Sequence, residues 1–337
     1  MYQKETFFKD MENCKIPFTH IEENITDPSL KAIDKLYGAA DVMSMENAKK
    51  HYFNLKLLAF FGTALAVLFL LYDEAELHLF IFLCIIILAI FGYSDKFGVQ
   101  YENHKKYLEY RVLAETLRVH YFLSIAGIKE HITIILPWFI KKNSPWINEI
   151  LLSLPVHTTT EKRSILNCWI RDQLEYHQKA WIESNEKKQR NDKSTRRALY
   201  ITVATFLIAG AFEFYMLFNA SGEIHINELG MILKTLQDSG IMVGFEQVDM
   251  IRSLLKIIVG SMSAFTLFLG SYYGKMSLSN EINDHRRMVM LYEKAENEVL
   301  QKGESEDLIM SLAHEFLIEN TLWFAYQSNN TPELILE

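Results

Sequence analysis

The chain has 337 residues, of which 50% are hydrophobic and 23% are charged, and its mean hydropathy is +0.02. So large an apolar fraction beside so much charge is unusual in a soluble protein, and it indicates that the apolar residues are clustered in segments. The formal net charge of −8 argues against a broad nucleic-acid-binding face, because too few cations remain to neutralise phosphates over a large area. The 6 prolines and 14 glycines favour long helices over a many-stranded sheet.

Residues 1–54 are polar and mixed in charge, and they lack the pattern of a secretory signal peptide. Two apolar runs follow, at residues 55–72 and 77–93, with only the short acidic turn Asp73-Glu74-Ala75-Glu76 between them. Each run approaches the ~20 residues that a helix needs to cross ~30 Å of hydrocarbon. The sequence therefore predicts a transmembrane hairpin over residues 55–93.

Residues 94–197 are expected to form a cytoplasmic helical region. One helix face carries a series at three- and four-residue spacing: Tyr110, Leu113, Leu117, Tyr121 and Ser124. A second face of the same helix carries Arg111, Glu115 and Arg118, which lie within reach of one another for ion pairs. Gly127 is expected to end or bend this helix. A further helix is expected from about Thr160 to Asn191, with its N-cap at Thr158 to Thr160.

The segment from Ile132 to Ile140 is apolar but too short to span a membrane, and a second Pro-Trp pair follows at Pro145-Trp146. Two interpretations remain open from the sequence. The segment either lies at the membrane interface, with Trp138 and Trp146 at the level of the headgroups, or it packs under the neighbouring helices.

A third apolar run covers residues 198–218 and a fourth covers 254–273, with a polar segment, 219–253, between them. These runs complete a prediction of an all-α membrane protein with four transmembrane helices and long cytoplasmic helical extensions. The alternative, that all four are core helices of a soluble bundle, is disfavoured because four such segments are rare in one soluble chain. Residues 274–337 are expected to form C-terminal helices that Gly303 interrupts.

Lysines and arginines gather on one side of the predicted spans, because the 73–76 turn has none and the 219–253 segment has only Lys234 and, at the edge of the fourth span, Arg252. The positive-inside rule therefore places residues 1–54, 94–197 and 274–337 in the cytoplasm and the 219–253 loop outside it. The basic run from Lys187 to Arg197 is interpreted as an anchor at anionic headgroups, although such a run also suits nucleic acid or acidic lipid.

Several strings in this chain resemble those of a known group of membrane effectors. The strings are Leu36-Tyr37-Gly38-Ala39-Ala40-Asp41-Val42, Tyr101-x5-Tyr107-x3-Arg111-x2-Ala114-Glu115-x-Leu117-Arg118-x3-Phe122-x4-Gly127, Trp169-Ile170-x2-Gln173-x2-Tyr176 and Glu315-x3-Glu319-x3-Trp323. Together they resemble SLATT, the SMODS- and SLOG-associating two-transmembrane domains, in a longer four-span form. The resemblance makes Tyr107, Arg111, Glu115 and Arg118 the cytoplasmic family motif.

The resemblance implies a pore-forming or membrane-disrupting effector of bacterial anti-phage defence, located in the inner membrane and acting as a homo-oligomer. Members are triggered by a sensor or nucleotide-binding module, and no nucleotide-binding domain is visible in this chain. A cytoplasmic partner, or the cytoplasmic helices themselves, would then supply the trigger. The alternative is a non-conducting membrane scaffold or sensor that anchors a cytoplasmic partner complex.

Polar and small residues in the third and fourth spans are the candidate site residues. The pore-lining candidates are Thr202, Thr205, Ala209, Glu213, Ser263 and Thr266. The candidates for close helix packing are Gly260, Ala264, Gly270 and Gly274. For Glu213 the alternative is a position near the outer boundary, where its carboxylate reaches water.

Enzymatic chemistry finds little support in the sequence. His314-Glu315 lacks the second histidine of a zinc helix, and Asp284-His285 is interpreted as an isolated pair on a solvated helix surface. Neither a phosphate-binding loop nor a nucleophile elbow is visible, and the three cysteines have no metal-ligand spacing. We therefore expect no catalytic residues, no metal and no cofactor, with the lipid bilayer as the main partner and no nucleic acid.

Overall fold

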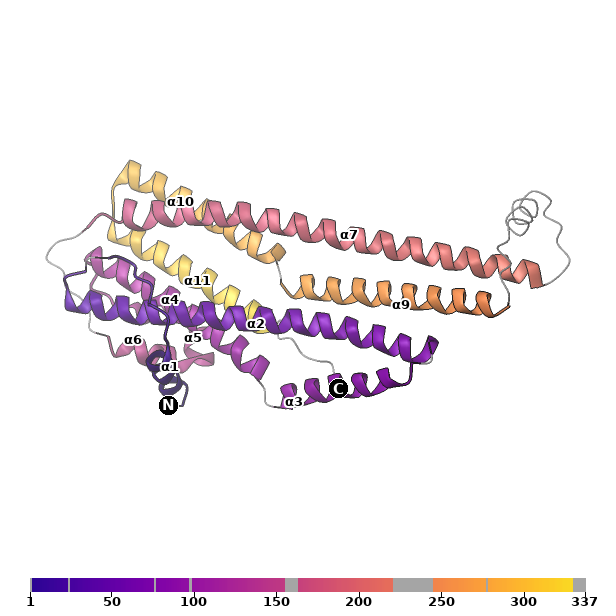
Figure 1. Ribbon diagram of the computed structural model, residues 1–337. Helices are drawn as coiled ribbons and strands as arrows, with labels where there is room; N and C mark the ends of the chain where they lie inside the picture. The colour runs from indigo at the N-terminus through magenta and orange to yellow at the C-terminus, as the bar shows by residue number, and fades with distance from the viewer. Residues whose placement is uncertain are drawn as a thin grey trace. The chain divides into compact units, whose positions relative to one another are not determined.

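A computed structural model describes residues 2–23, 25–75, 77–96, 99–154, 163–220, 245–276 and 278–329 (Figure 1). Within these ranges all regular structure is helical, and the predicted all-α class is confirmed for them. The helices are α1 (Tyr2–Asn13), α2 (Pro28–Glu74), α3 (Leu79–Lys96), α4 (Val99–Ile125), η1 (Ile132–Ile134), α5 (Trp138–Asn143), α6 (Pro145–Leu152), η2 (Leu166–Arg171), α7 (Asp172–Ala220), α9 (Phe245–Lys275), α10 (Leu278–Lys302) and α11 (Glu306–Asn329).

The chain divides into two compact units. Unit 1 comprises Met1–Leu55, Phe97–Lys188 and Ser277–Glu337, and unit 2 comprises Lys56–Lys96 and Gln189–Met276. Unit 2 contains the four apolar runs of the sequence, whereas unit 1 contains most of the polar helices. Both α2 and α7 contribute residues to each unit.

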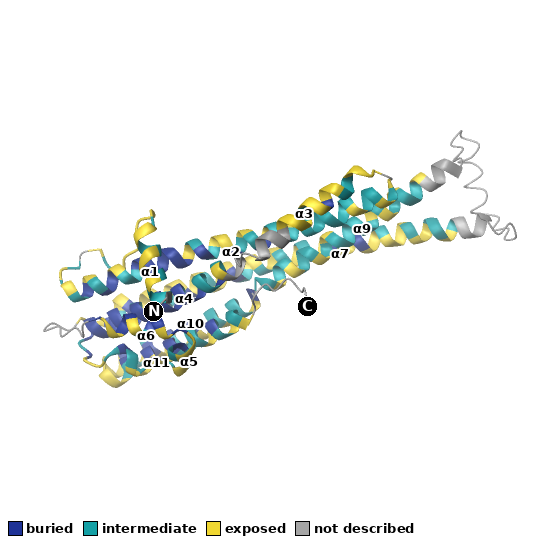
Figure 2. Cartoon of the chain, turned by 90° about the horizontal axis from the view of Figure 1, so that it is seen from below, coloured by how far each residue is buried: buried dark blue, intermediate teal, exposed yellow. Residues whose placement is uncertain are grey.

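The core of unit 1 is built around α4, whose side chains are buried on nearly every side (Figure 2). Leu113, Ala114 and Leu117 are fully buried, and α11 packs along the helix, bringing the Trp323 ring to 5.7 Å from the ring of Tyr107. The second, charged face that the sequence shows on α4 is therefore not a solvated one, since it too lies inside the unit.

The N-terminal helix completes this core. The ring of Phe7 is fully buried, 5.4 Å from the ring of Tyr110 and 5.7 Å from that of Trp146. Asp10, one turn further on, accepts a hydrogen bond of 2.7 Å from the Tyr110 hydroxyl and pairs with Lys106 at 2.9 Å. Residues of α1 therefore pack into unit 1.

The apolar segment around Ile132 is largely part of the core of unit 1. Ile132, Ile140 and Trp146 are all buried, so the interpretation that placed Trp146 at the headgroups is wrong. Trp138 differs, because its side chain is exposed and stacks under the Lys142 ammonium at 4.8 Å. Packing explains this segment except at Ile134 and Trp138, whose side chains are exposed.

Two glycines end helices in unit 1, as the sequence predicts. Gly127 follows α4 with φ 76°, and Gly303 follows α10 with φ 81°, both in the left-handed region where a side chain would be strained. The long helix predicted from about Thr160 instead starts as a short π-helix at Leu166, and its proposed N-cap at Thr158 to Thr160 lies outside the described residues.

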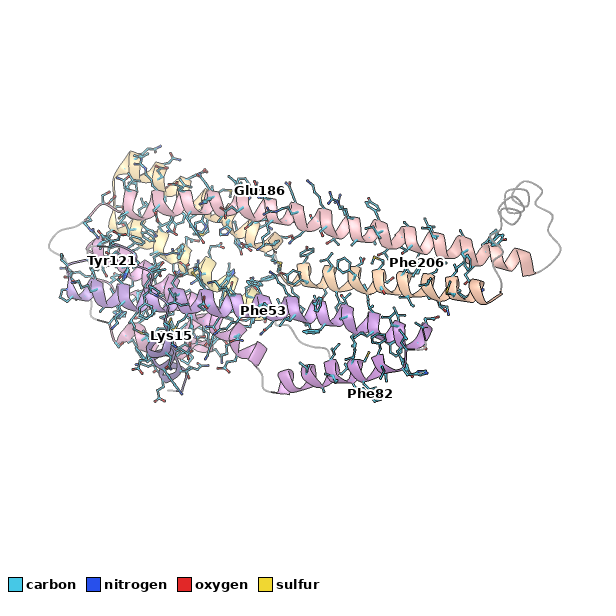
Figure 3. All side chains as sticks on the ribbon, viewed as in Figure 1. Lys15, Phe53, Phe82, Tyr121, Glu186 and Phe206 are labelled. Carbon is cyan, nitrogen blue, oxygen red and sulfur yellow. The ribbon has the colours of Figure 1, made fainter. Side chains whose placement is uncertain are left out.

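Unit 2 exposes many large apolar side chains. Three helical stretches, Pro28–Glu74, Leu166–Tyr215 and Met250–Lys302, are long and apolar enough to cross a membrane. Phe82 and Phe206, labelled in Figure 3, are more than half exposed. In water, exposed apolar area on this scale would favour aggregation or association.

The second predicted span is the shortest of the four. It corresponds to α3, whose apolar stretch Leu79–Ile90 falls below the length of a full span among the described residues, and the side chains after Ile90 are outside the description. On the other side of unit 2, α7 continues to Ala220 and α9 begins at Phe245, so the last part of the predicted 219–253 loop is helical. Residues 221–244 lie outside the described part of the chain.

Candidate functional site

Most of the polar pore-lining candidates in unit 2 bind one another or the backbone. The Thr202 and Thr266 hydroxyl oxygens are 2.9 Å apart, and the Thr202 hydroxyl also lies 3.2 Å from the carbonyl oxygen of Met262. The Thr205 hydroxyl donates to the Thr202 carbonyl at 2.7 Å, and the Ser263 hydroxyl donates to the Val259 carbonyl at 2.8 Å. The two contacts of Thr202 join α7 to α9, and the other two bonds lie within one helix. All of them satisfy hydroxyls that would be costly to leave unpaired in an apolar surrounding.

Glu213 forms a two-pronged ion pair. Nε of Arg252 lies 2.7 Å from one carboxylate oxygen and its Nη2 lies 3.1 Å from the other. Both side chains are partly exposed. The sequence marks Arg252 only as the edge of the next span, and the structure makes it the partner of Glu213. Ala209, one turn before Glu213 on the same face of α7, is half-buried.

The small residues of α9 divide into two groups. A Cβ added at Gly260 would lie 2.6 Å from a methyl carbon of Leu70 on α2, so the Leu70 side chain packs directly on α9 there. At Gly270 and Gly274 no described atom lies within 4 Å of an added Cβ, so no helix among the described residues packs closely on these two glycines. The packing role of these two glycines therefore stays a prediction, and Ala264, between the two groups in sequence, is half-buried.

A buried ion cluster occupies the centre of unit 1. Glu115 pairs with Arg111 on one side at 2.5 Å and with Arg118 on the other. Arg111 also reaches Asp41 of α2 at 3.4 Å. The predicted ion-pair reach along α4 is confirmed, and the cluster of two guanidiniums and two carboxylates is neutral in sum. The fourth motif residue, Tyr107, accepts a hydrogen bond at its backbone oxygen from Ser44 at 3.1 Å.

Opposing effects act on the pKa of Glu115. Burial raises it, and the neighbouring Arg111 and Arg118 guanidiniums outweigh burial, so that the pKa of Glu115 lies below its usual value. The carboxylate is therefore charged at neutral pH. Buried ion pairs of this kind contribute to stability only while every member keeps its partner.

A histidine pair lies beside the cluster. Nδ1 of His177 on α7 and Nδ1 of His285 on α10 are 2.9 Å apart, so one ring donates a proton and the other accepts it. The ring of Tyr292 stacks on His177 at 5.8 Å. The interpretation of His285 as solvated surface is therefore wrong, while Asp284 beside it pairs with Arg287 at 2.6 Å.

The histidines of unit 1 make it sensitive to acid. Burial, together with repulsion from His285, lowers the pKa of His177 to about 3, and burial next to His131 lowers that of His120 to about 4. Both rings are neutral in the folded chain, whereas free histidine binds a proton below about pH 6.5. The unfolded state therefore gains protons first, and the free energy of unfolding falls as the pH drops from about 6.5 towards the folded-state values.

We expect His177→Gln to lose less stability than the unchanged chain between about pH 7 and pH 5, because one of these proton-linked penalties is removed. The measurement is the shift of the thermal midpoint between the two pH values, for protein purified in detergent. His314→Gln, at an exposed position of α11, is the control and should behave like the unchanged chain. Equal shifts for all three proteins would contradict the assignment of the acid response to His177.

Unit 1 also encloses a polar cavity of about 460 Å³, a size typical of small-molecule sites. Arg118 and Gln173 line it from inside, and Tyr37 and Tyr121 form part of its wall. A described hydrogen-bond partner is lacking for both Nε of Arg118 and Oε1 of Gln173. The cavity therefore combines aromatic walls with two lining residues that each contain a buried polar atom without a described partner.

An ion pair between distant segments lies at this cavity. Both carboxylate oxygens of Glu22 pair with the Arg163 guanidinium, at 2.8 and 2.7 Å, and Glu22 also accepts a 2.7 Å hydrogen bond from Tyr121. These hydrogen bonds, that from Arg163 foremost, lower the pKa of Glu22 to about 2. Neither Glu22 nor Arg163 lies in a motif, and only their contact across 141 residues of chain reveals them.

Comparisons of this chain with protein-family models, with curated proteins and with solved structures find no match.

Proposed function

We propose that this chain is an inner-membrane protein that crosses the bilayer four times, with α3 as its second span and with residues 1–54, 94–197 and 274–337 in the cytoplasm. The exposed apolar side chains of unit 2 support this placement, because such side chains are stable in contact with hydrocarbon without being buried by other parts of the protein. The basic residues that flank the apolar runs support the orientation. The spans would then be the parts of α2, α3, α7 and α9 that belong to unit 2.

We further propose that copies of the chain associate in the membrane and permeabilise it when unit 1 receives a signal, as the resemblance to SLATT effectors implies. One observation carries this function above others. Gly270 and Gly274 form an open pair one turn apart on α9, with no described atom within 4 Å of either. Small residues at such a face allow the helices of two copies to approach closely.

In this proposal the structure corresponds to a resting state. Thr202, Thr205, Ser263 and Thr266 all have hydrogen-bond partners inside the unit, and Glu213 is paired with Arg252. A wet path would need these groups to exchange protein partners for water or ions. Activation must therefore rearrange α7 against α9.

The input to this rearrangement would be unit 1. Its polar cavity and its ion cluster share Arg118, so that a ligand or partner binding at the cavity would act directly on the cluster. The signal can shift the equilibrium between the resting and the active arrangement only by the difference between its binding free energies for the two. The signal is a cytoplasmic partner protein or a small molecule.

Ion flux from liposomes tests the proposal. Purified protein is reconstituted, and release of potassium and chloride is followed with and without the protein encoded by the neighbouring gene. We expect flux on activation, and we expect Glu213→Gln to lower the preference for potassium severalfold, because it removes the one acidic group among the pore candidates. The control is Glu74→Gln, another glutamate of unit 2 that forms an ion pair, with Lys256 at 3.0 Å.

The alternative is a scaffold or sensor that conducts nothing and anchors a cytoplasmic partner. The internal pairing of most of the polar groups in unit 2 favours it, because a non-conducting bundle needs all of them satisfied. Absence of flux under every condition, with the partner bound to the protein in the membrane, would establish the alternative and refute the pore.

A further inference from the structure

An apolar groove runs between α2 and α9 in unit 2. Its volume is about 550 Å³, and its walls are formed largely by Ala59, Ala64, Val67, Phe265 and Phe268. The hydroxyl of Thr63, the main polar group along its length, donates to the carbonyl of Ala59 in the same helix at 3.0 Å. The walls therefore offer contact to apolar groups and almost no free hydrogen bond.

The two helices that form the groove are antiparallel. Gly62 lies against Phe268, and Gly260 lies against Leu70, so that positions rising along α2 face positions falling along α9 (Figures 1 and 2). The absence of a side chain at Gly62 lets the Phe268 ring reach the α2 backbone and form the floor of the groove. The same pairing brings Tyr272 to the end of the groove where Lys56 lies.

The length of the groove matches one leaflet of a bilayer. From Lys56 to Leu68 the α2 axis rises about 18 Å, at ~1.5 Å per residue. Half of a hydrocarbon core of ~30 Å is about 15 Å. A groove with these dimensions accommodates one extended acyl chain from the bilayer surface to the midplane.

Charge distinguishes the two ends. Lys56 is exposed, is the only charged residue lining the groove, and forms no ion pair within the described part of the chain. The other end, at Leu68, is apolar. This polarity is that of a phospholipid, whose phosphate is anionic and whose chain is apolar. With Lys56 on the cytoplasmic side, the groove faces the leaflet in which anionic lipids attract basic residues.

We propose that this groove is a binding site for an anionic phospholipid, with one acyl chain along α2 and α9 and the phosphate paired with the Lys56 ammonium beside the Tyr272 hydroxyl. The inference rests on the membrane placement under the proposed function and requires no conduction. It assigns Lys56 a role separate from membrane orientation, because orientation needs only positive charge near the surface, whereas the site needs it at the mouth of the groove.

Native mass spectrometry of the full chain in detergent tests the site. Phosphatidylglycerol and phosphatidylcholine with the same acyl chains are titrated, and bound copies of each are counted. We expect phosphatidylglycerol to bind about fivefold more tightly, the effect of one lysine near a membrane surface. Lys56→Gln should abolish the difference, and Lys50→Gln, an exposed lysine of α2 outside the groove, should keep it.

A second variant tests the groove itself. Ala64→Phe places a ring in the path of the acyl chain, and binding of both lipids should fall while far-UV circular dichroism shows that the helices of both units remain folded. Equal binding of the two lipids to the unchanged chain, or equal losses for Lys56→Gln and Lys50→Gln, would overturn the proposal. Selective lipid binding without any flux would instead refute the pore and leave the lipid site standing.

Discussion

Glu115→Ala is expected to lower the free energy of unfolding of unit 1 by about 3–5 kcal/mol, the range for removing one member of a buried ion pair. The side chain of Glu115 holds Arg111 on one side and Arg118 on the other, and all three are largely buried. Removing the carboxylate leaves two positive charges near each other with only Asp41 as an anionic partner, at 3.4 Å from Arg111. Repulsion between the Arg111 and Arg118 guanidiniums and their incomplete solvation then both lower the free energy of unfolding.

Fluorescence is a suitable measurement because all five tryptophans of the chain lie in unit 1. Thermal or urea unfolding followed by this signal reports on the unit that contains the cluster. Glu183→Ala, at an exposed position of α7, is the matched control and should change stability by less than about 0.5 kcal/mol. A loss for Glu115→Ala as small as that of the control would show that the cluster does not hold the unit together.

Gly270→Leu is expected to abolish flux while leaving the single copy folded. No described atom lies within 4 Å of an added Cβ at this position, so the substitution starts in open space among the described residues. Replacing a helical glycine even stabilises the helix, by up to about 1 kcal/mol. Between copies, however, a leucine in place of glycine would hold two helices apart. We therefore expect at least a tenfold loss of flux and a shift of the particle mass from oligomer to single copy.

Two other glycines separate this effect from simple damage. Gly210→Leu adds the same side chain in open space on α7, away from the Gly270 and Gly274 pair, and should keep both flux and oligomer. Gly260→Leu would collide with Leu70 inside the unit and should lower stability. Light scattering after size-exclusion chromatography gives the mass. An unchanged oligomer and unchanged flux for Gly270→Leu would refute the role of this face.

The sequence predicts the helical segments well where one physical force dominates. Long apolar runs can be recognised in a sequence because a helix in hydrocarbon requires mainly apolar side chains. Three of the helical stretches in the structure are long and apolar enough to cross a membrane. The spacing of Leu113 and Leu117 likewise predicts a buried face of α4. The other face of α4 could not be predicted as buried, because Glu115 and Arg118 resemble solvent-exposed helix charges until Asp41 and the surrounding helices are placed.

Contacts between distant parts of the chain account for most of what the sequence did not reveal. His285 is an ordinary surface histidine until α7 brings His177 to it, 108 residues away in the chain. Trp138 is exposed and Trp146 is buried, although both follow a proline. Helix α5 directs its tryptophan outward, and helix α6 directs its tryptophan into the core. At Gly270 the composition suggests packing, and the structure shows no described atom within 4 Å of an added Cβ.

The construction of unit 1 from three separate stretches governs when it can fold. The His104 side chain bonds the Gln327 backbone at 3.0 Å, across 223 residues, and Trp323 packs on Tyr107. A ribosome making this chain synthesises all four apolar runs before it reaches α11. Under the proposed membrane placement, their insertion would therefore begin before unit 1 closes, and an incomplete chain would hold its apolar spans in the bilayer with unit 1 still open.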